Sequence, residues 1–300
     1  MLKSGTLAVA GLAAMACTPA QSSGSASAGK LSAPTAVAAP SIVTTPQQAL
    51  QPLTPVLATS ELVIGRNRFA LGLIGDDSRP ILNADIQLDF FELNGEVGTK
   101  RDEATATFRW VELQSKGIYT APVTFDHAGR WGVEVRATRE GRPLSARMSF
   151  DVRETGQAPS IGVAAPAVRT LTPSDVRDTT ELCTAAPPCD LHAQSLDAAL
   201  GSGAPMAVLF AAPGFCTSAV CAPQHGVFLE ARKRHPNRAN YLHVEIYKDP
   251  RSGTVSDAVT AWNLPSEPWV YFLDKQGIVV ERFEGIATLD ELEQALTALV

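Results

Sequence analysis

An apolar run that ends in a turn and two cysteines constrains the fold of this chain more than any other stretch. Residues 206–212 read MAVLFAA, which is typical of one central strand covered on both faces. Pro213 and Gly214 end the run, and Cys216 and Cys221 follow with four residues between them. A pair at the end of a buried strand can be a redox centre, a metal clamp or a structural disulfide.

The spacing of this pair limits where the next helix can begin. On a regular helix, Cα atoms five residues apart are separated by about 8.6 Å, whereas a disulfide requires about 7 Å or less. Pro223 fits best in the first turn of a helix, where a proline removes no backbone hydrogen bond. We therefore predict that the helix begins near Cys221 and that Cys216 lies in a preceding loop. His225 is interpreted as a surface polar residue; the alternative is that it raises the thiolate fraction of Cys221.

The N-terminus has the features of an export signal. Residues 1–16 carry Lys3 and a short apolar core, which is too short to span a bilayer comfortably. The segment AMAC resembles a lipobox, which implies cleavage before Cys17 and attachment of lipid to it. The alternative is an ordinary secretory signal cut near Ala16. We predict a lipid-anchored bacterial protein of the cell envelope that faces the extracytoplasmic side, where cysteine pairs can stay oxidised.

Composition divides the remainder of the chain into four segments. Residues 17–59 are rich in small and polar residues and lack apolar periodicity, so they are predicted to be a disordered tether. Residues 60–153 show apolar residues at every second position, typical of strands with one wet face. Residues 154–181 are predicted to be a second linker, and residues 182–300 alternate strand and helix patterns. The net charge of −6 provides no basic surface for a nucleic-acid partner.

The alternating segment is predicted to be an all-β sandwich of immunoglobulin-like type. About seven short strands, separated by turn signals such as GDDSRP, fit that class. The layout of the segment resembles the FixH/YtkA-like domains of bacterial envelope proteins. It contains no cysteine and a single histidine, so a spacer or docking module is favoured over an enzyme.

The final segment is predicted to be an α/β domain that resembles the thioredoxin family. A short helix at 195–201, the strand at 206–212, the helix after the cysteines, a strand at 241–247, a hairpin at 267–285 and a capped last helix follow one another. The resemblance implies that Pro268 is cis and faces the cysteines. It also implies that Cys216 is the nucleophile and Cys221 the resolving cysteine. The spacing departs from the family, which uses Cys-x-x-Cys.

A second pair of cysteines lies in the proline-containing stretch LCTAAPPCDLH. A structural disulfide between Cys183 and Cys189 is the favoured interpretation, because the segment is predicted to be exported and no helix follows directly. A second redox pair that relays electrons is the alternative. Crossed pairing with Cys216 and Cys221 also stays open, since four cysteines allow three connectivities.

Taken together, these features predict a membrane-anchored thiol-disulfide oxidoreductase that acts on a protein thiol or disulfide partner in the envelope. No cofactor is expected, because the chain has neither a Cys-x-x-Cys-His motif nor a glycine-rich nucleotide fingerprint. Two alternatives are retained. One is a non-catalytic binding or scaffold protein with structural disulfides. The other resembles the copper-handling Sco group, with Cys216, Cys221 and His225 as ligands.

Overall fold

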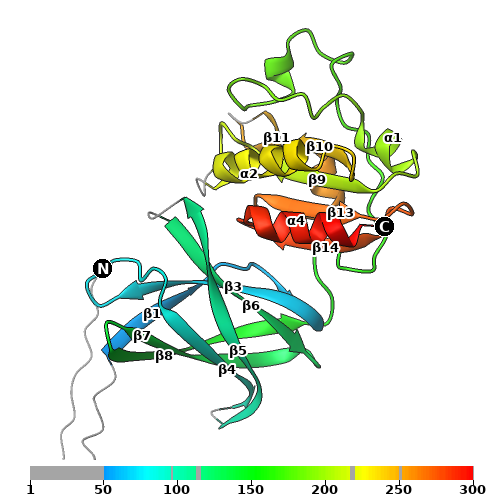
Figure 1. Cartoon of the computed structure of the whole chain (residues 1–300). Helices are drawn as coiled ribbons and strands as arrows, with labels where there is room; N and C mark the ends of the chain where they lie inside the picture. The colour runs from blue at the N-terminus through cyan, green and yellow to red at the C-terminus, as the bar shows by residue number, and fades with distance from the viewer. Residues whose placement is uncertain (1–50, 96, 113–115, 217–219, 250–251, 300) are drawn as a thin grey trace, which may run out of the picture. The chain divides into compact units, whose positions relative to one another are not determined.

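The computed structural model describes residues 51–299, apart from 96, 113–115, 217–219 and 250–251 (Figure 1). The predicted signal peptide, Cys17 and the tether up to residue 50 lie outside the described residues. Residues 48–300 group into one compact unit. Residues 51–57 form a strand, so ordered structure begins before the expected tether boundary at residue 59.

Eight strands in the first half of the described chain form one sheet, here called the N-terminal sheet. Their order is β1-β3-β6-β5-β4-β7-β8-β2. Their bounds are β1 Gln51–Leu57, β2 Leu62–Val63, β3 Gly65–Gly75, β4 Asp85–Asn94, β5 Val97–Glu112, β6 Lys116–Phe125, β7 Gly129–Arg139 and β8 Arg142–Arg153.

A single long strand makes this a continuous sheet rather than the predicted two-sheet sandwich. Residues 97–106 of β5 pair with β4, and residues 107–112 of the same strand pair with β6. The sheet also curls, because β1 pairs with β3 on one side and with β8 on the other. The alternating pattern identified strands correctly, but it contains no information on which strands share a sheet.

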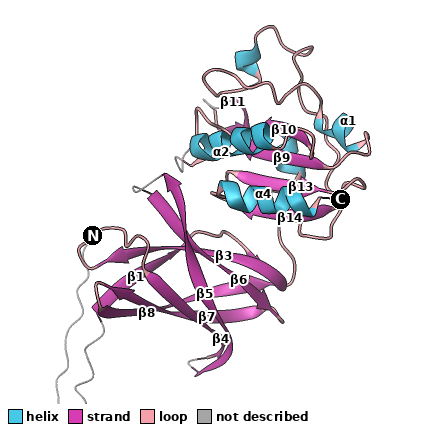
Figure 2. Cartoon of the chain, viewed as in Figure 1, coloured by secondary structure: helices cyan, strands magenta, loops and turns pink. Residues whose placement is uncertain are grey.

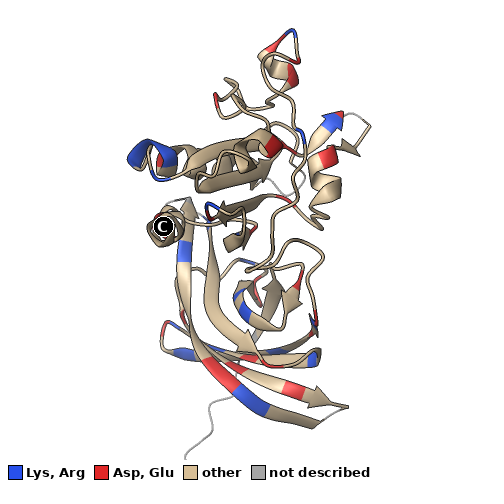
Figure 3. Ribbon diagram, turned by 90° about the vertical axis from the view of Figure 1, so that its right-hand side faces the viewer, with Lys and Arg blue, Asp and Glu red and all other residues tan. Residues whose placement is uncertain are grey.

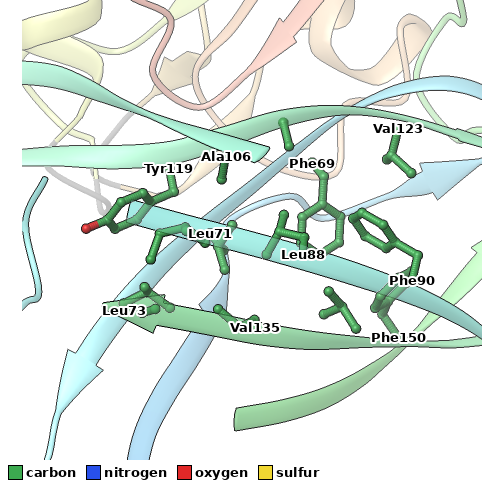
Figure 4. Packing of buried hydrophobic residues seen from close by; sticks show 14 of the residues in the cluster. Phe69, Leu71, Leu73, Leu88, Phe90, Ala106, Tyr119, Val123, Val135 and Phe150 are labelled. Carbon is green, nitrogen blue, oxygen red and sulfur yellow. The ribbon is translucent and has the colours of Figure 1, made fainter. Parts of the chain in front are cut away.

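The concave side of the N-terminal sheet holds an aromatic core. Phe69, Phe90 and Phe150 are buried together, and Figure 4 shows their rings among leucine and valine side chains from neighbouring strands. The rings of Phe69 and Phe90 meet edge to face with centroids 5.1 Å apart, an arrangement that aromatic pairs favour. Alternate residues of each strand supply this core, as the period-two pattern predicts.

The second half of the described chain contains a four-stranded sheet, the C-terminal sheet, in the order β10-β9-β13-β14. Strand β9 is parallel to β10 and antiparallel to β13. The elements are η1 Thr179–Glu181, α1 Leu196–Leu200, β9 Met206–Ala211, α2 Cys221–Arg234, β10 Asn240–Glu245, β11 Tyr247–Asp249, β12 Thr254–Val255, α3 Asp257–Ala261, β13 Trp269–Leu273, β14 Val279–Glu284 and α4 Leu289–Ala298.

Helices cover both faces of the C-terminal sheet, so β9 is buried at all six positions. Helices α2 and α4 lie side by side over one face (Figure 1), where Phe228 and Leu292 belong to the same buried cluster as Leu209. The one-turn helices α1 and α3 contribute to the core on the other face, with Phe210 of β9. A fully covered strand explains why its sequence is apolar at every position.

The predicted fold class, an immunoglobulin-like sandwich followed by an α/β thioredoxin-like domain, is wrong. Strand accounts for 45% and helix for 16% of the structure. In Figure 2, strands (magenta) accordingly predominate over helices (cyan). The residues described include only four α-helices, and two of these, α1 and α3, have five residues each. A curled eight-stranded sheet therefore dominates the architecture.

The expected linker at 154–181 has little regular structure but is held along the C-terminal sheet. The backbone N–H of Gly162 donates to the carbonyl of Val279, and the N–H of Val279 donates to the carbonyl of Val163. The indole N–H of Trp262 donates to the carbonyl of Pro166 at 3.0 Å. This segment is thus part of the packed structure.

The predicted hairpin at 267–285 and the predicted cap of the last helix are confirmed. Gly277 closes the β13–β14 hairpin with a φ of 75°, and Thr288 forms a capping box with Glu291 at the start of α4. Helix α2 ends in basic residues, which appear in blue at its C-terminal end in Figure 3. Cations at this end of a helix interact favourably with its dipole. No helix in the described part of the chain is long and apolar enough to cross a membrane.

Candidate functional site

The C-terminal end of β9 positions the first pair of cysteines, Cys216 and Cys221, here called the thiol pair. The strand ends at Ala211, and the turn that follows requires glycine, because a Cβ atom at Gly214 would lie 2.7 Å from the carbonyl oxygen of Thr184. Helix α2 begins at Cys221 with Val220 as its N-cap. The prediction that the helix begins late is therefore confirmed.

The two thiols of this pair have different environments. Neither cysteine is part of a disulfide; Cys221 is fully buried and Cys216 is half-buried. The backbone N–H of Cys221 donates to the Sγ atom of Cys216 at 3.4 Å. Burial raises the pKa of the Cys221 thiol, and its hydrogen bond with Cys216 raises it further. Negative charge is thus better tolerated on the Cys216 sulfur, at the N-terminus of α2.

A carboxylate and a proline from the two residues that precede β13 complete this site. The Glu267–Pro268 peptide bond is cis, as the sequence analysis expected of Pro268. Since Trp269 pairs with Phe210, this bond lies beside the end of β9. A carboxylate oxygen of Glu267 lies within 4.8 Å of both sulfurs of the thiol pair.

Sequence reasoning missed Glu267, although its position next to Pro268 was a usable signal. The hydroxyl of Tyr247 donates to its Oε1 atom at 3.3 Å. Burial raises the pKa of Tyr247, and the nearby Glu267 raises it further. Tyr247 therefore remains a neutral hydrogen-bond donor that orients the carboxylate.

An exposed aromatic ring precedes the half-buried thiol. Phe215 is 53% exposed, whereas most large apolar side chains of the C-terminal part are buried. A large exposed apolar side chain next to a reactive group offers a contact to another molecule.

The second pair of cysteines belongs to a group of four ligand-type side chains, here called the Cys/His cluster. Its members are Cys183, Cys189, His192 and His243, and one ligand atom from each lies within 4.8 Å of the others. The two sulfurs are 3.6 Å apart, and the Nδ1 atom of His243 lies 3.7 Å from the sulfur of Cys183 and 3.4 Å from that of Cys189. Both thiols are free, and the predicted structural disulfide stays a prediction.

Three contacts hold the loop that carries this cluster. Thr184 donates from its backbone N–H and from its hydroxyl to the Oε1 atom of Glu245, each at 2.7 Å. The N–H of His243 donates to the carbonyl of Leu191 at 3.0 Å, which lays the loop along β10. The loop is further fixed to α2 by an ion pair between Asp190 and Arg232.

Thr184 also connects the two sites. Its hydroxyl oxygen accepts a hydrogen bond from the N–H of Gly214 at 3.0 Å. The Thr184 hydroxyl thus contacts both the Glu245 carboxylate, at the end of β10, and the turn that leads to Cys216.

Hydrogen bonding fixes the orientation of His243. Its Nε2–H donates to the carbonyl of Ala211 at 3.1 Å, which leaves the lone pair of Nδ1 directed at the two sulfurs. Burial lowers the pKa of His192, which favours the neutral form of that imidazole. The hydrogen bond between the two sulfurs lowers the pKa of Cys183 and raises that of Cys189, so the pair readily holds one proton between them.

His225 does not behave as predicted. It is only 7% exposed, so its interpretation as a surface residue is wrong. Its ring lies 5.0 Å from the ring of His243, and burial lowers its pKa to about 4. Within the described chain, the group gathered at Cys216 and Cys221 is completed by Glu267 rather than by His225.

The sequence analysis also missed His192 and His243 as partners of the second cysteine pair. The stretch CDLH places His192 three residues after Cys189, a short Cys/His spacing that was a usable signal. His243 is distant in sequence, and only the parallel pairing of β10 with β9 brings it to the loop.

Comparisons with known proteins do not identify a family. No family model and no curated protein matches the chain. Among solved structures, part of the chain is similar to MtrC from Shewanella baltica OS185, with a TM-score of 0.27 and 17% identity over 38% of this chain and 24% of that one. A DUF4785 family protein from Legionella pneumophila gives a TM-score of 0.21 and 12% identity over 34% of this chain and 28% of that one. The chain thus spans about a quarter of each of these proteins, and neither likeness carries an argument about fold or function.

Proposed function

We propose that this chain is a thiol-disulfide oxidoreductase, anchored in the cell envelope by lipid on Cys17, that exchanges disulfides through Cys216 and Cys221. One observation carries the proposal: two cysteines that form no disulfide meet at the start of α2, and one is half-buried while the other is fully buried. This asymmetry suits a nucleophile that meets the partner and a resolving thiol that does not.

The exchange begins at Cys216 when the pair is reduced. Its thiolate attacks one sulfur of a partner disulfide, so that a Cys216–partner bond forms and the partner's own S–S bond breaks. The second partner sulfur leaves as a thiolate and takes a proton from water. The N–H of Cys221, 3.4 Å from the Cys216 sulfur, stabilises the attacking thiolate.

The second step closes the internal disulfide. Cys221 gives its proton to the Glu267 carboxylate and attacks the Cys216 sulfur, which releases the remaining partner sulfur as a thiolate. In total, the thiol pair loses two electrons and the partner disulfide gains them. The reverse sequence oxidises a partner dithiol. Phe215, exposed beside Cys216, supplies an apolar contact for the partner chain.

Trapping experiments in the full chain test this proposal. Cys221→Ser keeps the nucleophile but cannot resolve, so it should accumulate a mixed disulfide with a disulfide-containing protein substrate. Cys216→Ser should form none. Ala222→Ser is the matched control, since Ala222 is exposed next to Cys221 and the change adds a hydroxyl without removing a thiol, and it should exchange at the parent rate.

Two results would count against exchange through this pair. One is a Cys216→Ser variant that exchanges at the parent rate but melts at a lower temperature, which would favour the scaffold alternative. The other is mixed disulfide that accumulates on Cys221 instead of Cys216.

A further inference from the structure

We propose that Cys183, Cys189, His192 and His243 bind one Zn²⁺ ion in a closed, four-coordinate site. The inference is separate from the exchange chemistry, because it uses other cysteines and assigns them a structural role. Zinc sites of this kind take thiolate and imidazole ligands in tetrahedral geometry.

The spacing of the ligand atoms fits this geometry. A regular tetrahedron with Zn–S of about 2.3 Å and Zn–N of about 2.05 Å has S···S edges of about 3.8 Å and S···N edges of about 3.6 Å. In the Cys/His cluster the sulfurs are 3.6 Å apart, and Nδ1 of His243 is 3.7 Å and 3.4 Å from them. A nitrogen of His192 lies within 4.8 Å of these atoms.

The hydrogen bonds around the cluster orient its members as ligands. The Nε2–H of His243 donates to the carbonyl of Ala211, which is the arrangement that directs a histidine lone pair at a metal. The N–H of Cys189 donates to the sulfur of Cys183 at 3.4 Å, which stabilises a thiolate. The Nε2 atom of His192 is buried and has no hydrogen-bond partner among the described residues, so a ligand role for His192 displaces no printed hydrogen bond of that atom.

Charge balance selects a divalent ion. Two thiolates and two neutral imidazoles carry a charge of −2, which Zn²⁺ cancels and Cu⁺ would leave half uncompensated. Because Cys183, His192 and His243 are buried, an uncompensated charge there would be costly. An ion can still enter, because Cys189 and His192 both line a surface hollow together with Pro188.

The position of the cluster defines what the metal does. Three of its ligands come from the loop 183–192 and the fourth from β10, so the ion fastens an irregular loop to the edge of the C-terminal sheet. Through Thr184 that loop also supports Gly214, close to Cys216. Metal coordination keeps Cys183 and Cys189 out of disulfide exchange, which leaves one reactive pair in the chain.

Metal titration of the full chain tests the site. The parent for this experiment carries Cys17→Ser, Cys216→Ser and Cys221→Ser, so that only the cluster offers thiols. After reduction and removal of metal, we expect one Zn²⁺ per chain by native mass spectrometry. Co²⁺ should give the absorption of a tetrahedral thiolate site, and Zn²⁺ should protect both cysteines from alkylation.

Two histidine variants distinguish a residue that binds the metal from one that only lies near it. His243→Ala should weaken Zn²⁺ binding more than the roughly 10- to 100-fold that loss of an outer-shell partner costs. His225→Gln is the matched control and should bind as the parent does, although its ring is adjacent to His243. The alkylation protection in the parent decides the question if His243→Ala does not fold.

Three outcomes would overturn the proposal. The first is a reduced parent that takes up no Zn²⁺, and the second is a site that takes up Cu⁺ but not Zn²⁺. The third is protein isolated from the envelope with a disulfide between Cys183 and Cys189 and no bound metal.

Discussion

The contact between Thr184 and Glu245 provides the most quantitative test of how the site is held. Thr184→Val keeps the shape of the side chain but removes the hydroxyl that donates to Glu245 at 2.7 Å and accepts from Gly214 at 3.0 Å. The Glu245 side chain is only 11% exposed, so water replaces the lost donor poorly. A hydrogen bond to a charged group contributes about 1.5–3 kcal/mol. Gly214 is exposed, and its N–H can turn to water at little cost.

Alkylation of Cys183 in the reduced, metal-free protein measures this contribution. Cys183 is 2% exposed, so it reacts only when its loop opens. A loss of about 1.5–3 kcal/mol should make opening, and therefore alkylation, about 10- to 150-fold faster in Thr184→Val. Thr184→Ser keeps the hydroxyl and should react within a few-fold of the parent. Equal rates for the parent and Thr184→Val would refute the reasoning.

Three further predictions concern the core, the partner contact and acid stability. Phe228→Ala removes a fully buried ring on the inward face of α2 and should lower the free energy of unfolding, measured in urea, by about 3–5 kcal/mol. A loss below about 1 kcal/mol would contradict the packing. Phe215→Ala should slow exchange with a protein substrate but leave reduction of the thiol pair by dithiothreitol unchanged, and equal slowing of both reactions would argue against a partner contact. Burial raises the pKa of Glu291, but the hydrogen bond and charge of Arg68 outweigh it and hold the pKa below its usual value. The free energy of unfolding should therefore fall as the pH drops below about 4.3, the unfolded value. Glu291→Gln should flatten this decline and Glu293→Gln should not.

Local features of this chain were predictable because neighbouring residues determine them. Pro223 fixes the beginning of α2, and the capping box of Thr288 and Glu291 fixes the beginning of α4. The run at 206–211 is apolar at every position, which predicts a strand covered on both faces. The structure buries all six of its residues. Each of these depends on residues within about one turn or one strand of each other.

Features that depend on distant pairing were not predictable in the same way. The alternating pattern in β5 identifies a strand. It does not indicate that one half of this strand pairs with β4 and the other half with β6 in one curled sheet. His243 follows Cys189 by 54 residues, and it reaches the sulfurs only because β10 pairs in register with β9. The burial of His225 likewise depends on which face of α2 packs against the sheet. A single histidine in a helix does not indicate whether it lies on the buried or the exposed face.

The central claim, that Cys216 and Cys221 form an exchangeable disulfide, is tested most directly by redox equilibration of the full chain. The protein is equilibrated in glutathione buffers of defined potential, and the fragment that spans both cysteines is then analysed by mass spectrometry. The account predicts a reversible Cys216–Cys221 disulfide with a reduction potential above about −300 mV. A pair that stays reduced in every buffer, or a disulfide that the most reducing glutathione buffer leaves intact, would contradict it.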